Sequence, residues 1–139
     1  MNKKSIISSN ANIGVDVNIG PFCLIEDGVT IGSRTNIRSH VIIKSGTVIG
    51  EDCDVYSGAI LGEQPQDLKY KNESTTLTIG DNNIVREFCT MHRGTIDRRE
   101  TKIGNNCMFM AYSHIAHDAK INDNVILSNG VQVGGHVDI

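Results

Sequence analysis

Aromatic residues are scarce in this chain, which has no tryptophan and only three phenylalanines and three tyrosines among its 139 residues. The core must therefore be built mainly from aliphatic side chains, above all isoleucine and valine. These residues favour strands, so the composition indicates a stacked β architecture. The length is that of a single domain.

The sequence also lacks any long apolar run. Lys3 and Lys4 are followed by SIISSNAN, which is too short and too polar for the core of a signal peptide or for a membrane span. The net charge of -3 provides no excess of positive charge with which to bind nucleic acid or an anionic membrane. The sequence therefore predicts a cytoplasmic protein with no nucleic-acid partner and no membrane insertion.

What the sequence does contain is an apolar residue at every sixth position, unbroken over nine intervals from Ile7 to Leu61. A period of six fits neither an α-helix nor an alternating strand. It is typical of a β-helix in which each hexapeptide forms one short strand and three strands complete one coil. The full series is Ile7, Ile13, Ile19, Ile25, Ile31, Ile37, Ile43, Ile49, Val55, Leu61, Ile79, Val85, Met91, Ile103, Phe109, Ile115, Ile121, Leu127, Val133 and Ile139.

A second series of small or β-branched residues follows the first by four positions. Each hexapeptide is therefore predicted to point two side chains inward. All four cysteines belong to this second series and none forms a CxxC pair, so we expect buried structural thiols. The series is Ala11, Val17, Cys23, Val29, Thr35, Val41, Thr47, Cys53, Ala59, Cys89, Cys107, Ala119, Val125, Val131 and Val137.

The repeat is interrupted at residues 63–78 and 95–102, and after both polar segments it returns to the same phase. We therefore expect two loops that leave the coil at its corners, within a single β-helix domain spanning residues 1–139. Loops on a rigid scaffold are common places for binding residues, and the first one carries Asp67 and Lys69.

The histidines fall outside both inward series and are expected on the outer surface. His117 and His136 are nineteen residues apart. Because three hexapeptides make one coil, their imidazoles should lie on neighbouring strands about 4.8 Å apart. His114 is expected at the neighbouring corner, which would complete a cluster in which one imidazole acts as a general base.

Three segments carry a resemblance to a known family: GEQPQDLKY at residues 62–70, IGDNNIVREFCTMHRGT at 79–95 and HIAHDAKINDNVILSNGVQVGGHV at 114–137. In this order they resemble the acyl-carrier-protein–UDP-N-acetylglucosamine O-acyltransferases that begin lipid A synthesis. Related N-acyltransferases of that pathway typically have a DRGA-like segment where this chain has HRGT, and AHN where it has AHD.

The resemblance implies an all-β fold, a left-handed parallel β-helix of hexapeptide repeats, assembled as a homotrimer with sites between neighbouring columns. It implies transfer of an (R)-3-hydroxyacyl chain from acyl carrier protein to the 3-hydroxyl of UDP-N-acetylglucosamine, with a 3-amino sugar as an alternative acceptor. No metal or organic cofactor is implied. Family members continue with further coils and a helical carboxy-terminal domain, so this chain is expected to be the amino-terminal part of such an enzyme.

By resemblance, His117 is the general base that takes the proton from the sugar hydroxyl, and Asp118 orients its imidazole. Neighbouring residues on a strand point to opposite faces, so this pairing requires a corner between them. The backbone N–H of Gly135 would stabilise the oxyanion. The resemblance places the remaining contacts at His114, His136, Asp67 and Lys69 for the sugar nucleotide, and at Gln66 for the pantetheine or acyl chain of the carrier.

Two other functions fit parts of the sequence. γ-Class carbonic anhydrases use the same coils and bind zinc through three histidines at a subunit interface, and the HxxH spacing of His114 and His117 suits metal ligands. That chemistry gives no role to QDLKY or HRGT. The other alternative is a β-helical fragment or sugar-nucleotide-binding module without catalysis, because Ile139 opens a new hexapeptide with no capping element after it.

Overall fold

The computed structural model describes residues 4–139, which form short strands and contain no helix. Within this range there is accordingly no helix with the length and apolar character needed to cross a membrane. In chain order the strands are β1 (Ile6–Ile7), β2 (Asn12–Ile13), β3 (Asn18–Ile19), β4 (Leu24–Ile25), β5 (Thr30–Ile31), β6 (Asn36–Ile37), β7 (Ile42–Ile43), β8 (Thr47–Ile49), β9 (Asp54–Val55), β10 (Ile60–Glu63), β11 (Thr76–Ile79), β12 (Ile84–Val85), β13 (Thr90–His92), β14 (Glu100–Ile103), β15 (Met108–Phe109), β16 (His114–Ile115), β17 (Lys120–Ile121), β18 (Ile126–Leu127) and β19 (Gln132–Val133).

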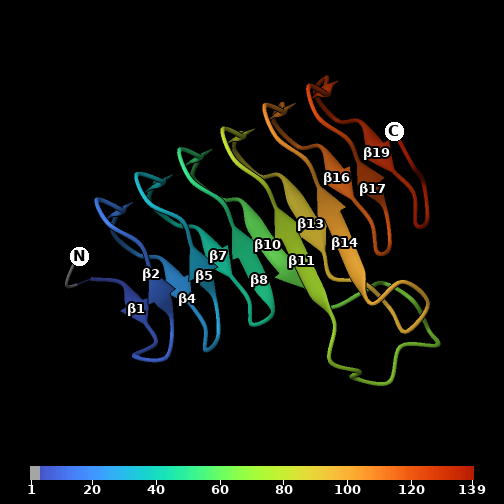
Figure 1. The fold of residues 1–139 in the computed structure, drawn as a ribbon, viewed down its shortest axis with the longest axis horizontal. Coiled ribbons are helices and arrows are strands. Elements are labelled where there is room, and N and C mark those ends of the chain that lie inside the picture. Colours follow the sequence, from blue (N-terminus) through green and yellow to red (C-terminus); the bar gives the residue numbers. More distant parts are fainter. Residues whose placement is uncertain (1–3) are drawn as a thin grey trace.

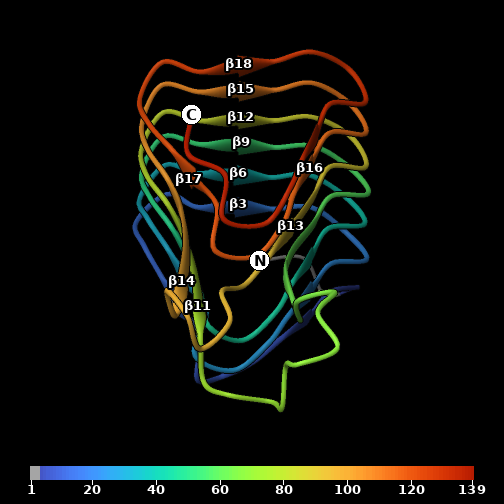
Figure 2. The same cartoon turned by 90° about the vertical axis from the view of Figure 1, so that its right-hand side faces the viewer.

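The strands stack into three parallel sheets because every third strand returns to the same side of the coil. The orders are β1-β4-β7-β10-β13-β16-β19, β17-β14-β11-β8-β5-β2 and β18-β15-β12-β9-β6-β3. Figure 1 shows successive coils advancing along the long axis, and in Figure 2 the sheets form three sides of a prism. Ile25 pairs with Ile43, three hexapeptides further on. The predicted left-handed parallel β-helix is confirmed.

The apolar series with a period of six forms the core, as predicted. The side chains of Ile25 and Ile43 are at most 1% exposed, and burying a side chain of this size contributes about 1.5–3 kcal/mol. All four cysteines are free and buried. Burial raises the pKa of the Cys89 thiol, so this thiol stays neutral at physiological pH. The prediction of structural cysteines is confirmed.

All three corners of the prism contain residues with a left-handed backbone, including the corner between the seven-stranded sheet and the sheet that contains β17. At this corner it occurs at Gly28, Gly46, Asp118 and His136, with φ of 72°, 84°, 60° and 63°. Glycine adopts this region freely, and aspartate and histidine are among the side chains that tolerate it best. The chain turns sharply there, so the side chains of neighbouring residues can point to the same side.

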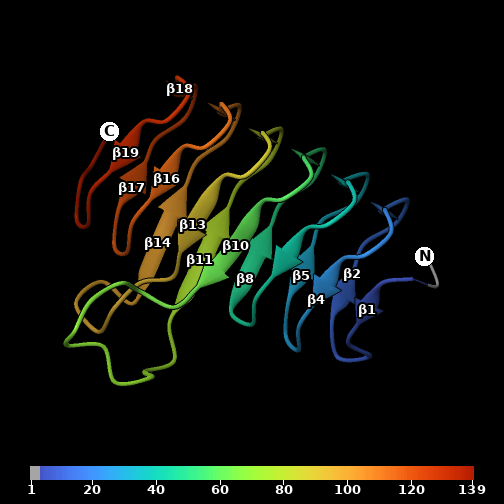
Figure 3. The ribbon, with the colours of Figure 1, turned by 180° about the vertical axis from the view of Figure 1, so that it is seen from behind.

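Two loops leave this corner, at residues 64–75 between β10 and β11 and at residues 93–99 between β13 and β14. Figure 3 shows both below the coils, the first in green and the second in orange. Arg93 fastens the second loop to the first, because its guanidinium donates to the carbonyl of Gly62 at 2.7 Å and to the hydroxyl of Tyr70 at 2.9 Å. The two loops are therefore joined at their bases.

The boundaries of these loops differ from the predicted segments 63–78 and 95–102. β10 extends to Glu63, and residues 76–79 pair with residues 100–103 in a parallel ladder. The outward-facing residues of this ladder are polar, as loop residues are, which explains why the sequence pattern assigned them to loops. The second loop also begins two residues earlier than predicted, at Arg93.

Candidate active site

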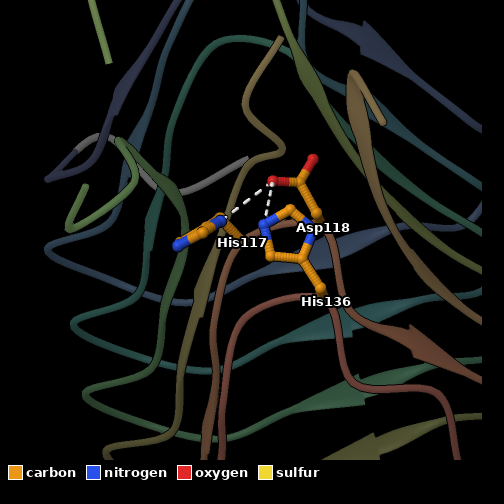
Figure 4. A group of neighbouring side chains, drawn as sticks. All are labelled: His117, Asp118 and His136. Atoms are coloured by element: carbon orange, nitrogen blue, oxygen red, sulfur yellow. Dashed lines mark hydrogen bonds and ion pairs between the residues drawn. The ribbon is translucent and has the colours of Figure 1, made fainter. Parts of the chain in front are cut away.

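His117 and Asp118 lie at the left-handed corner between β16 and β17. The positive φ of Asp118 turns the chain, so these two neighbouring side chains meet. His117 Nδ1 lies 2.9 Å from Asp118 Oδ2. Figure 4 shows the other ring nitrogen of His117 directed away from that carboxylate. The requirement for a corner between the two residues is confirmed.

The carboxylate of Asp118 is fully buried. Its Oδ1 accepts from the backbone N–H of Thr95 at 2.9 Å and of Arg98 at 3.2 Å, and its Oδ2 accepts from the Thr95 hydroxyl at 2.5 Å. Burial alone would raise the pKa of Asp118, but the hydrogen bonds from Thr95 and His117 outweigh it and lower that pKa. Asp118 is therefore an ionised acceptor, and His117 must donate to it from Nδ1.

His136 lies on the next coil beside His117, as predicted from their spacing. The ring centroids are 5.2 Å apart and the rings are nearly perpendicular, at 87°. His136 Nε2 is 3.8 Å from Asp118 Oδ2 and 3.7 Å from Asp97 Oδ2. The His136 side chain is 43% exposed and that of His117 is 15% exposed, so the second imidazole stands at the surface above the first.

Gly135 packs directly against the imidazole of His117. A Cβ atom at Gly135 would lie 2.8 Å from His117 Cε1 and 2.9 Å from His117 Nε2. Within residues 4–139 the Gly135 N–H donates to no other group. Position 135 therefore has both properties expected of an oxyanion donor beside the base, an uncommitted N–H and no side chain.

Replacing Gly135 with alanine is expected to displace the His117 ring, because the added methyl group cannot fit at 2.8 Å. A misplacement of this size costs about 100-fold in catalytic rate. Gly134→Ala is the matched control, since its Cβ would meet nothing closer than Val137 Cγ2 at 3.9 Å. Steady-state catalytic rates of the two variants provide the check, and equal rates would contradict the expected steric effect.

His114 has a different ring partner from the one that the sequence predicted. Within the described residues it contacts His92 instead, with ring centroids 4.6 Å apart, and its Nδ1 lies 2.7 Å from the Thr90 hydroxyl. The reason is its place on β16, directly beside β13, whereas His117 comes after the corner. The structure thus gives two histidine pairs, His92–His114 and His117–His136.

His92 was expected to project from the outer surface of the coil, and the structure shows that its side chain is nevertheless buried. Its side chain points out of the coil core but is only 7% exposed, and its Nδ1 has no hydrogen-bond partner within residues 4–139. Burial, together with the neighbouring His114, lowers the pKa of His92 to about 4. His92 is therefore a neutral imidazole one coil away from the candidate base.

The depressed pKa of His92 predicts a loss of stability in mild acid. The folded state disfavours protonation, so the stabilisation is complete above the ordinary pKa of 6.5 and is lost as the pH falls towards 4. The loss amounts to about 3 kcal/mol at most, since one pKa unit corresponds to about 1.4 kcal/mol. Denaturant unfolding from pH 7 to pH 4 should show a smaller acid loss for His92→Gln than for the wild type. His40→Gln changes an exposed histidine and should lose as much stability in acid as the wild type. An equal loss in all three proteins would show that His92 is not its source.

The first loop brings Asp67 and Lys69 to the second loop. Asp67 Oδ1 accepts from the Lys69 backbone N–H at 2.9 Å. Both residues line a small pocket together with Thr95 and Asp97, which contact Asp118 and His136 respectively. Gln66 is exposed on the same loop, and the structure gives it no contact with the other site residues. Its predicted role stays a prediction.

Thr95 and Arg98 are site residues to which the sequence interpretation gave no role. The sequence did contain one indication for Thr95. It stands four positions after Met91, the spacing of the series that points inward. Its hydroxyl does point inward, to the buried Asp118. No sequence pattern places the backbone N–H of Arg98 beside the same carboxylate.

His117, Asp118 and His136 each have one atom that could coordinate a metal ion, and these three atoms lie within 4.8 Å of one another. Within residues 4–139 no other group of three such side chains is found. The group differs from the three-histidine zinc site considered above, because His114 lies elsewhere and the third donor is a carboxylate. Both oxygens of that carboxylate already accept hydrogen bonds. The arrangement favours a hydrogen-bonded base over a metal centre.

Comparison with known families and curated proteins shows what the chain is similar to. Residues 100–135 match the bacterial transferase hexapeptide (six repeats) family. The acyl-[acyl-carrier-protein]–UDP-N-acetylglucosamine O-acyltransferase of Thermodesulfovibrio yellowstonii is 44% identical over 140 residues, which cover 100% of this chain and 54% of that protein. The protein of the same name from Pseudomonas aeruginosa is 51% identical over 137 residues, covering 98% of this chain and 53% of that protein.

Solved structures give the same result. The UDP-N-acetylglucosamine acyltransferase of Bacteroides fragilis matches with a TM-score of 0.98 at 38% identity, and LpxA from Acinetobacter baumannii with 0.97 at 46% identity. Each match covers 99% of this chain and 54% of the solved chain. The chain thus spans about half the length of the relatives it matches.

Proposed function

The chain belongs to the acyl-[acyl-carrier-protein]–UDP-N-acetylglucosamine O-acyltransferase family, and we propose that it transfers an (R)-3-hydroxyacyl chain from acyl carrier protein to the 3-hydroxyl of UDP-N-acetylglucosamine, the first step of lipid A biosynthesis. The observation that carries this proposal is the imidazole of His117, which has Nδ1 on the buried Asp118 and Nε2 free. A hydroxyl is a poor nucleophile near neutral pH, so the reaction needs a base positioned in this way.

In the proposed reaction, His117 Nε2 takes the proton of the sugar 3-hydroxyl while the oxygen attacks the thioester carbonyl carbon. The charge that develops on the carbonyl oxygen is stabilised by the Gly135 N–H. The tetrahedral intermediate then expels the carrier thiolate, which takes the proton back from His117. Asp118 accepts from Nδ1 throughout and stabilises the imidazolium that forms between the two proton transfers.

The proposed sugar-nucleotide contacts are divided between the coil and the first loop. His136 stands exposed above the base, and Asp67 and Lys69 line the pocket that also contains Asp97. A carboxylate and an ammonium are suited to the hydroxyl and phosphate groups of such a substrate. His114, on the His92 side of the site, and Gln66, at the exposed loop, complete the proposed set, with Gln66 facing the acyl carrier.

The proposed working form is a homotrimer in the cytoplasm. The first loop supports an assembly, because Leu68 at its tip is 99% exposed between Asp67 and Lys69. A partner subunit that covered this side chain would remove its apolar surface from water, which is favourable. In a trimer the tip of the loop would contact the neighbouring subunit.

A non-catalytic sugar-nucleotide-binding module is the second candidate, because the side chains proposed to hold the sugar nucleotide, Asp67, Lys69 and His136, are present whether or not transfer follows. The test is transfer of a radiolabelled 3-hydroxyacyl group from acyl carrier protein to UDP-N-acetylglucosamine by the whole 139-residue chain, with its mass in solution measured alongside. Labelled sugar nucleotide is the expected product. Binding of UDP-N-acetylglucosamine by calorimetry without any transfer would instead establish the binding module.

A further inference from the structure

The second loop closes over the carboxylate of Asp118 through a set of hydrogen bonds centred on Thr95. The Thr95 hydroxyl donates to Asp118 Oδ2 at 2.5 Å, and the Thr95 N–H donates to Oδ1 at 2.9 Å. Thr95 is 4% exposed and Asp118 is not exposed at all.

The direction of every proton in this set is determined by the carboxylate. An ionised carboxylate only accepts, so both the Thr95 hydroxyl and His117 Nδ1 must donate to Asp118 Oδ2. The Thr95 oxygen in turn accepts from the Asp97 N–H at 3.3 Å. The hydroxyl is therefore held from both sides, and His117 is left with its proton on Nδ1 and its lone pair on Nε2.

A competitor for Asp118 Oδ2 stands close by. His136 Nε2 lies 3.8 Å from this oxygen, just beyond hydrogen-bond distance. If the Thr95 hydroxyl were absent, Oδ2 would lack one of its two donors and the carboxylate could rotate towards His136. Such a rotation would weaken its bond to His117 Nδ1. The charged and titratable groups around this carboxylate are Asp97, Arg98, His136 and Asp138, and His92 is close enough to His117 for the two rings to interact electrostatically.

We propose that Thr95 is a positioning residue, whose hydroxyl holds the Asp118 carboxylate against His117 so that the imidazole keeps Nε2 free as the base. This inference rests on the proposed function of His117, although the geometry of the hydrogen bonds is independent of it. Thr95 itself does not touch the reacting atoms. Its effect is expected on the rate of the chemical step and not on substrate binding.

The first test compares Thr95→Val with Thr95→Ser. Valine keeps the shape and the backbone N–H of residue 95 but removes the hydroxyl, while serine restores it. We expect Thr95→Val to lower kcat by about 10- to 100-fold, the range expected for the loss of one hydrogen bond to a buried charge. KM should stay within about twofold and Thr95→Ser within about threefold of the wild-type kcat. Equal loss in both variants, or a change in KM alone, would overturn the proposal.

The second test measures the tautomer of the His117 imidazole and needs no catalytic activity. The ¹⁵N chemical shifts of His117 in the whole chain report which ring nitrogen carries the proton. We expect the Nδ1–H form in the wild type and in Thr95→Ser, and a mixture of both forms in Thr95→Val. Thr35→Val is the matched control, because Thr35 is equally buried and bonds the Gly50 carbonyl far from the site.

An unchanged His117 tautomer in Thr95→Val would overturn the positioning role even if the enzyme were active. A changed tautomer in a chain that transfers no acyl group would uphold it and count only against the proposed function. The two failures are therefore distinguishable.

Discussion

Replacing His117 with alanine is expected to lower the rate of acyl transfer by about 10²- to 10⁴-fold, the contribution of a positioned general base. The reason is the position of its imidazole, with Nδ1 on the ionised Asp118 and Nε2 free beside Gly135. Stability is also expected to fall, by about 1–3 kcal/mol, because the buried Asp118 loses one of its hydrogen-bond donors. The measurement is kcat/KM for transfer of a radiolabelled 3-hydroxyacyl group to UDP-N-acetylglucosamine.

His40→Ala is the matched control for this variant. His40 also has a left-handed backbone at a corner of the coil, with φ of 60°, but it is exposed and stacks on Phe22 with ring centroids 5.1 Å apart. It should retain the wild-type rate. Loss of less than about tenfold in His117→Ala would mean that another group removes the proton.

Replacing Asp118 with asparagine is expected to have a comparable effect through the tautomer of His117. An amide presents one oxygen and one NH₂ group, whereas all four partners of the Asp118 carboxylate are donors. If the oxygen faces the N–H groups of Thr95 and Arg98, the NH₂ group faces His117 and forces its proton onto Nε2. The rate should then fall by about 10²- to 10⁴-fold, because Nε2 no longer accepts a proton.

Asp118→Asn should also lower the free energy of unfolding, by about 1–3 kcal/mol, since a buried donor is left without an acceptor. Asp138→Asn is the control. Asp138 pairs with Arg98 at the surface, where its side chain is 57% exposed, and such a pair contributes about 0–1 kcal/mol. Unfolding in urea measures both variants. Equal stability of Asp118→Asn and the wild type would contradict the described set of hydrogen bonds.

The fold could be predicted from the sequence because each coil repeats the same physical requirement. A residue such as Ile43 must be apolar at its inward position, and the same requirement returns six residues later. The pattern does not determine the handedness of the coil, which came from the resemblance to the family. The ends of the loops were missed at Thr76 and Glu100, because polar side chains on the outside of a strand resemble those of a loop.

The site was predictable where it depends on the period of the coil. The spacing of His117 and His136 placed their rings side by side, and the structure confirms it at 5.2 Å. The contacts of Thr95 and Arg98 with Asp118 depend instead on how the second loop folds back, which no period describes. The burial of His92 likewise depends on its packing against His114, a contact between coils that the spacing of single residues did not identify.

The central claim is that a sugar hydroxyl, activated at His117, is the nucleophile. The most direct test is the structure of the product, determined by NMR after complete turnover of 3-hydroxyacyl carrier protein with UDP-N-acetylglucosamine by this chain. The proposed chemistry predicts an ester at the 3-oxygen of the glucosamine ring, formed by the wild type and not by His117→Ala. Unmodified sugar nucleotide together with free 3-hydroxy fatty acid would show that water is the nucleophile and would contradict the claim.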